Sequence, residues 1–346
     1  MFQWLEKLWN AHVYQNETSS FSRLLTPFSL LYMSLTWVKR TVTRLPGIYV
    51  RVKNPVVSVG NITVGGSGKT PFILWLLEEM QGRGLSPVLI TRGYKAKFTG
   101  PFARRLYGKW DREGFFGDEL EMVLQKFPML DAAVGKQRAL LAKEFENLDE
   151  RRILIYEDAY QYFRLHRDLD IVIIHCQRGF GNRGIFPSGP LREGLFGLKR
   201  AKVLILYQLQ GDQEEFLKPY RHYLSGNIKV FSMQSTLQNS SLLHKKRVIA
   251  LASIAWPQSF LQDLKDAGAE VLSLITPGDH QGLSIDEQKE LLNQASILKC
   301  DFVCMTAKDK PKWKIEDPRI LVLHQKTEVK NGTELIEIIR NIKKAP

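Results

Sequence analysis

A glycine-rich turn between an apolar run and a helical run constrains this fold more than any other feature of the sequence. Residues 55–60 are β-branched enough for a buried strand, and residues 72–80 fit a helix. Between them stands Gly65-Gly66-Ser67-Gly68-Lys69-Thr70. This is the layout of a phosphate-binding loop, whose backbone N–H groups and helix N-terminus surround phosphate oxygens. We expect Lys69 to neutralise the β- and γ-phosphates and Thr70 to offer its hydroxyl to Mg²⁺.

The loop departs from the common G-x-x-x-x-G-K-[ST] pattern at one position. Thr63 stands at the first position, where glycine is usual, although two glycines follow soon after it. The flanking strand and helix make a chance match improbable. The sequence therefore predicts nucleotide binding by Gly65, Gly66, Ser67, Gly68, Lys69 and Thr70.

The rest of the chain alternates between apolar and amphipathic runs. Expected strands are residues 88–91, 153–156, 171–175, 203–207, 248–251, 271–274, 302–306 and 320–323, and expected helices are 119–127, 136–146, 259–266, 285–295 and 333–343. Such alternation predicts an α/β protein with a mostly parallel sheet that helices cover, and a second, smaller α/β domain. The predicted division is 1–46 for an N-terminal region, 47–232 for the P-loop core, 233–246 for a polar linker, and 247–346 for the smaller domain.

The N-terminal region favours a helix that lies on a membrane. Residues 24–38 are uncharged, but this run is shorter and more polar than the roughly 20 apolar residues that span a bilayer. Apolar residues recur at helical spacing: Phe28, Leu31, Tyr32, Leu35, Val38, Val42 and Leu45. Lys39, Arg40 and Arg44 follow at the C-terminal end. An interfacial helix on an anionic membrane fits this pattern, and a helix packed on its own domain fits it equally well.

Charge and cysteine content narrow the class of protein. The chain has 49 Lys and Arg against 36 Asp and Glu, a net charge of +13, which favours an anionic partner. It has three cysteines, which excludes a disulfide scaffold. Cys300 and Cys304 lack a second ligand pair, so we interpret them as buried thiols rather than as a zinc site.

Three acidic motifs are candidates for the chemistry. Asp118 opens an expected helix, where it either caps the helix or acts as a base. Glu157 and Asp158 follow an expected strand, on the side of an α/β sheet where ligands bind, and could hold Mg²⁺. His280 follows an aspartate in a loop. A long glycine- and proline-rich loop also contains Arg192, which could contact phosphate.

In order, these motifs resemble those of the tetraacyldisaccharide 4′-kinases of lipid A synthesis. The matching segments are residues 58–71, 91–94, 117–119, 167–172, 179–182, 187–193, 279–280 and 306–309. Thr63 at the first loop position fits that family. The resemblance implies an N-terminal membrane-associating helix at the cytoplasmic face of the bacterial inner membrane.

The resemblance also implies an activity, with ATP and Mg²⁺ as cofactors. The γ-phosphate would pass to the 4′-hydroxyl of an acylated glucosamine disaccharide 1-phosphate. Asp118 would be the base, assisted by His280, and Lys69 would act on the phosphates. Thr70, Glu157 and Asp158 would hold the metal, while Arg192 and Glu193 would join the nucleotide site.

The chain departs from the family pattern after residues 153–156. Glu157 replaces an aspartate, Ala159 a glycine and Tyr162 a histidine, and His175 stands where the family has an acidic residue. The main alternative to a kinase is a membrane-associated switch or assembly ATPase that hydrolyses ATP without a lipid acceptor. A nucleic-acid-binding protein would also suit the positive charge, but the chain lacks a long basic run or a known binding motif.

Overall fold

The computed structural model describes residues 9, 13–14, 20–94, 96–149, 151–254, 256–277 and 282–342. It divides into two compact units. Unit 1 comprises Met1–Gln234 and Glu328–Pro346, and unit 2 comprises Ser235–Thr327. Within the described ranges, no helix is both long enough and apolar enough to cross a membrane.

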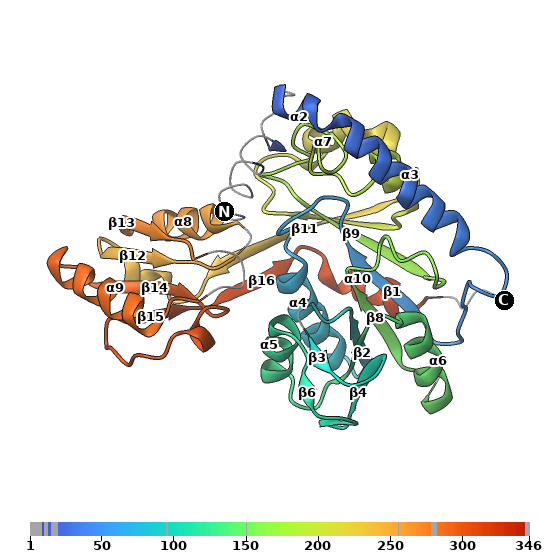
Figure 1. Cartoon of the computed structure of the whole chain (residues 1–346), viewed down its shortest axis with the longest axis horizontal. Helices are drawn as coiled ribbons and strands as arrows, with labels where there is room; N and C mark the ends of the chain where they lie inside the picture. Colours follow the sequence, from blue (N-terminus) through green and yellow to red (C-terminus); the bar gives the residue numbers. More distant parts are fainter. Residues whose placement is uncertain are drawn as a thin grey trace. The chain divides into compact units, whose positions relative to one another are not determined.

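A ten-stranded sheet forms the centre of unit 1 (Figure 1). Its order is β16 (Gln325–Val329), β11 (Lys229–Leu237), β10 (Val203–Tyr207), β9 (Leu169–His175), β1 (Val56–Gly60), β8 (Ile153–Glu157), β2 (Pro87–Thr91), β7 (Asp131–Gly135), β4 (Phe102–Leu106) and β5 (Lys109–Trp110). The strands from β11 to β7 pair in parallel, and β4 and β5 are antiparallel. The expected α/β fold with a mostly parallel sheet is confirmed.

Alternation along β1 divides the core between the two faces of this sheet. Val57 and Val59 face a cluster with α4 (Lys69–Gly82), α5 (Asp118–Lys126) and α10 (Gly332–Arg340), whereas Val56 faces α6 (Arg138–Leu148). Every residue of β1 is buried, which is typical of a parallel strand covered by helices on both faces. The loops after β1, β8 and β9 consequently meet at one edge, beyond the carboxyl ends of the strands.

Unit 2 has its own four-stranded parallel sheet in the order β13 (Glu270–Ile275), β12 (Arg247–Leu251), β14 (Phe302–Thr306) and β15 (Ile320–Leu323). Helices α8 (Pro257–Asp266) and α9 (Ile285–Ile297) pack against it.

The smaller elements of the chain are β3 (Lys97–Phe98), β6 (Gly114–Phe115), α7 (Gln213–Leu217), η1 (Leu195–Arg200), η2 (Lys218–Tyr223), η3 (Ser240–Leu243) and η4 (Lys310–Lys312).

The division into units differs from the one expected at the C-terminus. Residues 328–346 belong to unit 1, because α10 packs there and leaves no room for a side chain at Gly332, whose Cβ would lie 2.4 Å from the Trp75 ring. Residues 233–246 contain the end of β11 and η3 rather than an extended linker. The serine-rich composition of this segment did not predict the end of β11, a strand whose alternate residues, such as Met233 and Ser235, are buried.

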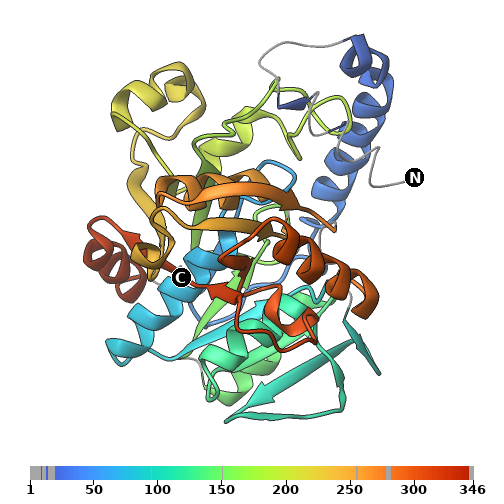
Figure 2. The same ribbon diagram turned by 90° about the vertical axis from the view of Figure 1, so that its left-hand side faces the viewer.

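Helices α2 (Ser20–Leu24) and α3 (Thr26–Val42) lie on the outside of unit 1 in both views (Figures 1 and 2). The residues on the side of these helices that faces the rest of unit 1 are small or polar. Ser22 and Ser29 are buried, while Tyr32, Thr36 and Arg40 are half-buried. The exposed side holds large apolar residues: Leu24, Phe28, Leu30, Leu31, Met33, Leu35, Trp37, Val38 and Val42.

Candidate functional site

Two glycines shape the loop that follows β1. Gly65 and Gly68 have φ of +92° and +87°, a left-handed conformation that side chains disfavour. Gly68 caps α4, and a Cβ there would lie 2.4 Å from the ring of Tyr207. The loop thus needs glycine at this point both for its backbone and for lack of space. Its amide groups and the start of α4 form a phosphate-binding cradle.

Lys69 begins α4 and reaches two partners across the sheet edge. Its Nζ donates to Asn61 Oδ1 at 3.3 Å and lies 3.4 Å from Asp158 Oδ1. Asp158 has a φ of +47° and accepts from Arg192, whose Nη1 lies 2.8 Å from each carboxylate oxygen. Lys69, Asp158 and Arg192 therefore form a compact cluster of charges beside the phosphate-binding loop.

The charges of this cluster fix the protonation of Asp158. Burial by itself would raise the pKa of its carboxyl, but Lys69 and Arg192 outweigh burial and hold the pKa well below its usual range. Asp158 is therefore ionised at any physiological pH. The guanidinium of Arg192, which we expect to contact phosphate, pairs with Asp158 in the structure.

Glu157 is in the opposite electrostatic situation. Burial, together with the neighbouring Glu119 and Asp158, raises the pKa of Glu157 to about 8, although Lys69 opposes the shift. Glu157 and Glu119 share a hydrogen bond, so one proton stays between two carboxyls at neutral pH. Asp118, the residue before Glu119, is the first residue of α5, and Gly117 is the N-cap of that helix. The pair of glutamates thus brings the start of α5, and Asp118 with it, to the edge that holds the phosphate-binding loop.

The long loop before η1 is attached to the segment that leads into the phosphate-binding loop. Val64 N donates to Pro190 O at 2.7 Å, and Arg192 N donates to Ile62 O at 2.7 Å. Glu193 accepts from Gln161 Nε2 at 2.9 Å and from Arg200 at 2.8 Å. Gln161 also donates to Asn61 O at 2.9 Å. Arg192 and Glu193 therefore lie beside the phosphate-binding loop, and hydrogen bonds hold them from both sides.

Two residues that the sequence did not single out support the loop from behind. Arg178 Nη1 donates to Gly66 O at 3.0 Å, and its guanidinium lies 3.9 Å from the centre of the Tyr14 ring. Tyr14 donates its hydroxyl to Val64 O at 2.6 Å. The segment before α2 thus touches the phosphate-binding loop directly. The sequence carried a signal for Arg178, which opens the glycine motif at 179–182, but none for Tyr14.

Arg138 is a third residue that sequence reasoning missed. It donates to Glu157 O at 2.7 Å, and its guanidinium lies 4.5 Å from the centre of the Tyr162 ring. The Tyr162 hydroxyl accepts from Ala139 N at 3.0 Å, at the start of α6. Tyr162, which replaces the histidine of the family pattern, therefore has a defined structural task beside the site.

His175, the other departure, stands at the end of β9. Its ring meets that of Tyr207 edge-on, with 5.0 Å between the ring centres. Burial, with Arg178 nearby, lowers the pKa of His175 to about 4. The imidazole is therefore neutral at physiological pH and supports Tyr207, which in turn packs against Gly68.

Other predicted residues lie away from this edge or outside the described ranges. His280 is outside them. Cys300 and Cys304 are buried free thiols, as expected. Asp309 in unit 2 is buried and accepts from Thr306 at 2.7 Å and from Ser253 N, which is a structural role. In the part of the chain that the structure describes, no three His, Cys, Asp or Glu side chains converge as a metal site.

Comparison with protein families gives one consistent match. The family model described as tetraacyldisaccharide-1-P 4′-kinase matches residues 21–344. Two similar curated proteins carry the name tetraacyldisaccharide 4′-kinase. The one from Shewanella halifaxensis is 35% identical over 317 residues, which cover 89% of this chain and 88% of that protein. The one from Hamiltonella defensa is 32% identical over 316 residues, covering 90% and 89%.

A solved structure agrees with these matches. The crystal structure of LpxK from Aquifex aeolicus in complex with ATP superposes with a TM-score of 0.67 at 26% sequence identity. The alignment covers 93% of this chain and 99% of that one. The likeness thus extends over both units and includes the elements that carry the phosphate-binding loop.

Proposed function

This chain belongs to the tetraacyldisaccharide-1-P 4′-kinase family, and from that premise we propose how its residues perform the reaction. The protein is an ATP-dependent kinase of lipid A biosynthesis. Its acceptor is the 4′-hydroxyl of a tetraacyldisaccharide 1-phosphate. The observation that carries the residue assignments is the Lys69, Asp158 and Arg192 cluster beside a glycine loop, with Asp118 next to the Glu119–Glu157 pair.

Phosphate binding rearranges the charge cluster. The backbone amides of the loop and the N-terminus of α4 hold the β- and γ-phosphates. Lys69 then turns from Asp158 to the phosphate oxygens, and Arg192 keeps Asp158 compensated. Charge that develops on the transferred phosphoryl group meets a cation that is already in place.

Asp118 acts on the acceptor. The sugar oxygen attacks the γ-phosphorus, the bond to the β-phosphate oxygen breaks, and ADP leaves. The hydroxyl proton passes to the Asp118 carboxylate. His280 assists that carboxylate in this proposal, which rests on the family motif alone.

The residues present also fit a Mg²⁺ ion. Burial, with the neighbouring Glu119 and Asp158, raises the pKa of Glu157, and carboxylate oxygens gathered in this way are ligands that suit Mg²⁺. Thr70 adds a hydroxyl from the first turn of α4. Asp158 stays near them, although Lys69 and Arg192 occupy its oxygens. When bound, the ion neutralises phosphate charge.

A turnover assay tests these assignments. The protein in detergent is given ATP, Mg²⁺ and a tetraacyldisaccharide 1-phosphate, and the phosphorylated lipid is quantified. We expect K69A to lower kcat/KM by about 100- to 1,000-fold, since a cation at the transferred phosphate is lost, and D118N to lower kcat by a similar factor. K126A is the matched control, because Lys126 forms an exposed ion pair on α5.

Three outcomes would contradict the proposal. ATP hydrolysis without any lipid product would favour the switch ATPase. Full activity of D118N would remove the base assignment. Full activity of K69A would remove the phosphate role of Lys69.

We further propose that α3 binds the cytoplasmic face of the inner membrane. Its apolar side is exposed, while the side toward the body is polar, with Ser29 Oγ donating to Ile185 O at 2.8 Å. Leu31, Leu35 and Trp37 are 58%, 61% and 66% exposed. Lys39 and Arg40 stand in the last turn. An apolar face beside basic residues matches the interface of an anionic bilayer.

Vesicle flotation tests this membrane proposal. We expect the double variant L31E/L35E to lower the partition into phosphatidylglycerol-containing vesicles at least tenfold, because two leucines of the exposed apolar side become charged. I297E is the control, since Ile297 is an even more exposed apolar residue in unit 2. If L31E/L35E leaves flotation unchanged but dissolves an oligomer, a second copy covers α3 and the membrane proposal fails.

A further inference from the structure

Four arginines surround one phenylalanine ring where α3 ends. Phe163 lies in the loop between β8 and β9 and is half-buried. The guanidinium carbons of Arg40, Arg44, Arg167 and Arg200 lie 5.1, 5.2, 5.7 and 5.1 Å from the centre of its ring. Arg40 and Arg44 come from the N-terminal helix region, and the other two come from the body of unit 1.

The arginines of the body are neutralised where they stand. Arg167 donates to both oxygens of Asp170, at 2.7 and 3.2 Å. Arg200 donates to Glu193 at 2.8 Å. Ion pairs within the chain therefore neutralise both arginines on that side of the ring.

Arg40 and Arg44 differ in this respect. Among the described residues, neither forms an ion pair with a carboxylate. Burial lowers the pKa of Arg40, and the nearby Arg200 and Arg44 lower it further, against the smaller opposing effects of Glu193 and Tyr160. The two guanidinium groups therefore lie close to each other and repel, and a bound anion would reduce this repulsion.

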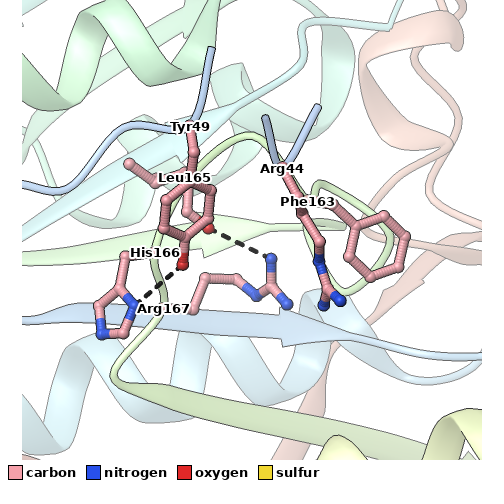
Figure 3. A pocket seen from close by; sticks show the side chains of 6 residues that line it. All are labelled: Arg44, Tyr49, Phe163, Leu165, His166 and Arg167. Carbon is pink, nitrogen blue, oxygen red and sulfur yellow. Dashed lines mark hydrogen bonds between the residues drawn. The ribbon is translucent and has the colours of Figure 1, made fainter. Parts of the chain in front are cut away.

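A cavity opens beside Arg44 (Figure 3). It measures about 290 Å³ and is lined by Arg44, Tyr49, Phe163, Leu165, His166 and Arg167. A water molecule occupies about 30 Å³ in the liquid, so a phosphate group has ample room. Figure 3 shows the Arg44 side chain lying beside the Phe163 ring and the Tyr49 hydroxyl turned to His166.

The other polar groups of the cavity are paired. The Tyr49 hydroxyl and His166 Nδ1 are 3.0 Å apart, and His166 Nε2 lies 3.3 Å from Asp168. Burial lowers the pKa of His166, so its ring is neutral at physiological pH. Uncompensated positive charge in this place therefore comes from Arg40 and Arg44.

We propose that Arg40 and Arg44, with the cavity beside Phe163, bind the headgroup phosphate of an anionic phospholipid. The inference rests on the proposed membrane binding of α3. The site stands at the C-terminal end of the exposed apolar side, where Val38 and Val42 are exposed, so an embedded α3 places it at headgroup depth. Guanidinium forks match phosphate oxygens bidentately, which is why arginine rather than lysine suits the site.

Vesicle flotation of variants that lose the same number of positive charges distinguishes a specific phosphate site from general electrostatic attraction to the membrane. Each basic residue near an anionic surface accounts for about a fivefold change in affinity. We expect K39Q/R23Q, which removes two charges elsewhere on α2 and α3, to lower binding to phosphatidylglycerol vesicles about 25-fold. R40Q/R44Q should lower it at least threefold more than that. R40K/R44K keeps the charge and should still bind at least threefold more weakly than the wild type.

Each result has one meaning. If R40Q/R44Q matches K39Q/R23Q and R40K/R44K matches the wild type, the cations act only as general charge and the site does not exist. Binding to phosphatidylcholine vesicles, which reports the apolar side alone, should be the same for all variants. If the wild type binds no vesicle at all, the membrane proposal itself fails, and the site proposal fails with it.

A kinetic measurement distinguishes the two sources of lipid phosphate. In detergent without phospholipid, we expect R40Q/R44Q to leave KM for the tetraacyldisaccharide 1-phosphate within twofold of the wild type. A KM that rises several-fold while vesicle binding stays at the level of K39Q/R23Q would assign the site to the substrate's phosphate and overturn the proposal. Unchanged thermal unfolding midpoints show that each variant folds.

Discussion

Helices α3 and α4 are both rich in apolar residues, yet they place them in opposite directions. In α4, six residues are buried: Phe72, Ile73, Trp75, Leu76, Leu77 and Met80. In α3, which is longer, Ser29 alone is buried. Helix α4 is covered by the large sheet and by α10, whereas α3 turns its polar side to the body. The comparison teaches that apolar content shows how much surface a helix must cover but not what covers it.

The largest expected effect would break or support this contrast directly. L76A removes a fully buried side chain from α4 and should lower the free energy of unfolding by about 2–5 kcal/mol. L31A, the same substitution on the exposed side of α3, should change it by less than about 0.5 kcal/mol. Urea unfolding followed by far-ultraviolet circular dichroism measures both. Equal losses would mean that α3 packs as tightly as α4.

The second expected effect concerns the charged residues near the two helices. Carboxyls converge near the start of α4, and guanidinium groups converge near the end of α3. Because the pKa of Glu157 is raised to about 8 from an ordinary 4.5, the folded state binds a proton more tightly than the unfolded one. Wild type should therefore lose stability as pH rises from about 4.5 to about 8, by on the order of 5 kcal/mol.

The E157Q variant sharpens this pH test. It carries no titrating carboxyl, so the difference in unfolding free energy between E157Q and wild type should grow with pH and level off above about 8. Measurements without ATP and Mg²⁺ from pH 5 to 9 check this. E79Q, at the half-buried ion pair of Glu79 with Arg83 near the end of α4, should follow the wild-type pH profile. A flat difference for E157Q would show that Glu157 does not share a proton with Glu119.

The smallest expected effect concerns the hydrogen bond between Tyr14 and Val64, a residue of the segment that leads to α4. Y14F removes the hydroxyl that donates to Val64 O, which corresponds to about 1 kcal/mol for one hydrogen bond. The Kd for ATP should rise about fivefold, measured by calorimetry. Y49F loses a hydroxyl contact with His166 away from the loop and should leave that Kd unchanged. An unaltered Kd for Y14F would mean that the N-terminal segment does not help to position the loop.

Local patterns in the sequence were sufficient for much of the fold. The strand before the glycine turn, the helix after Lys69 and the helix that starts at Asp118 all follow from periodicity and turn chemistry, which act between near neighbours. Not all strands were predicted: β7, with buried Ala132, Ala133 and Val134, was missed, and several other missed strands are polar or short. Strand β11 alternates polar residues with buried ones, and β5 has two residues. Nothing in their composition separates them from loops.

The sequence by itself singled out the groups that we propose for the chemistry, namely a glycine loop with Lys69 and Thr70, and acidic residues after the neighbouring strand. The tertiary structure alone decided which of them meet. It paired Arg192 with Asp158 and Glu119 with Glu157, brought Tyr14 to the loop, and turned the polar side of α3 inward. The reason is that contacts between residues far apart in the chain depend on how the strands are ordered in the sheet, and no local pattern encodes that order.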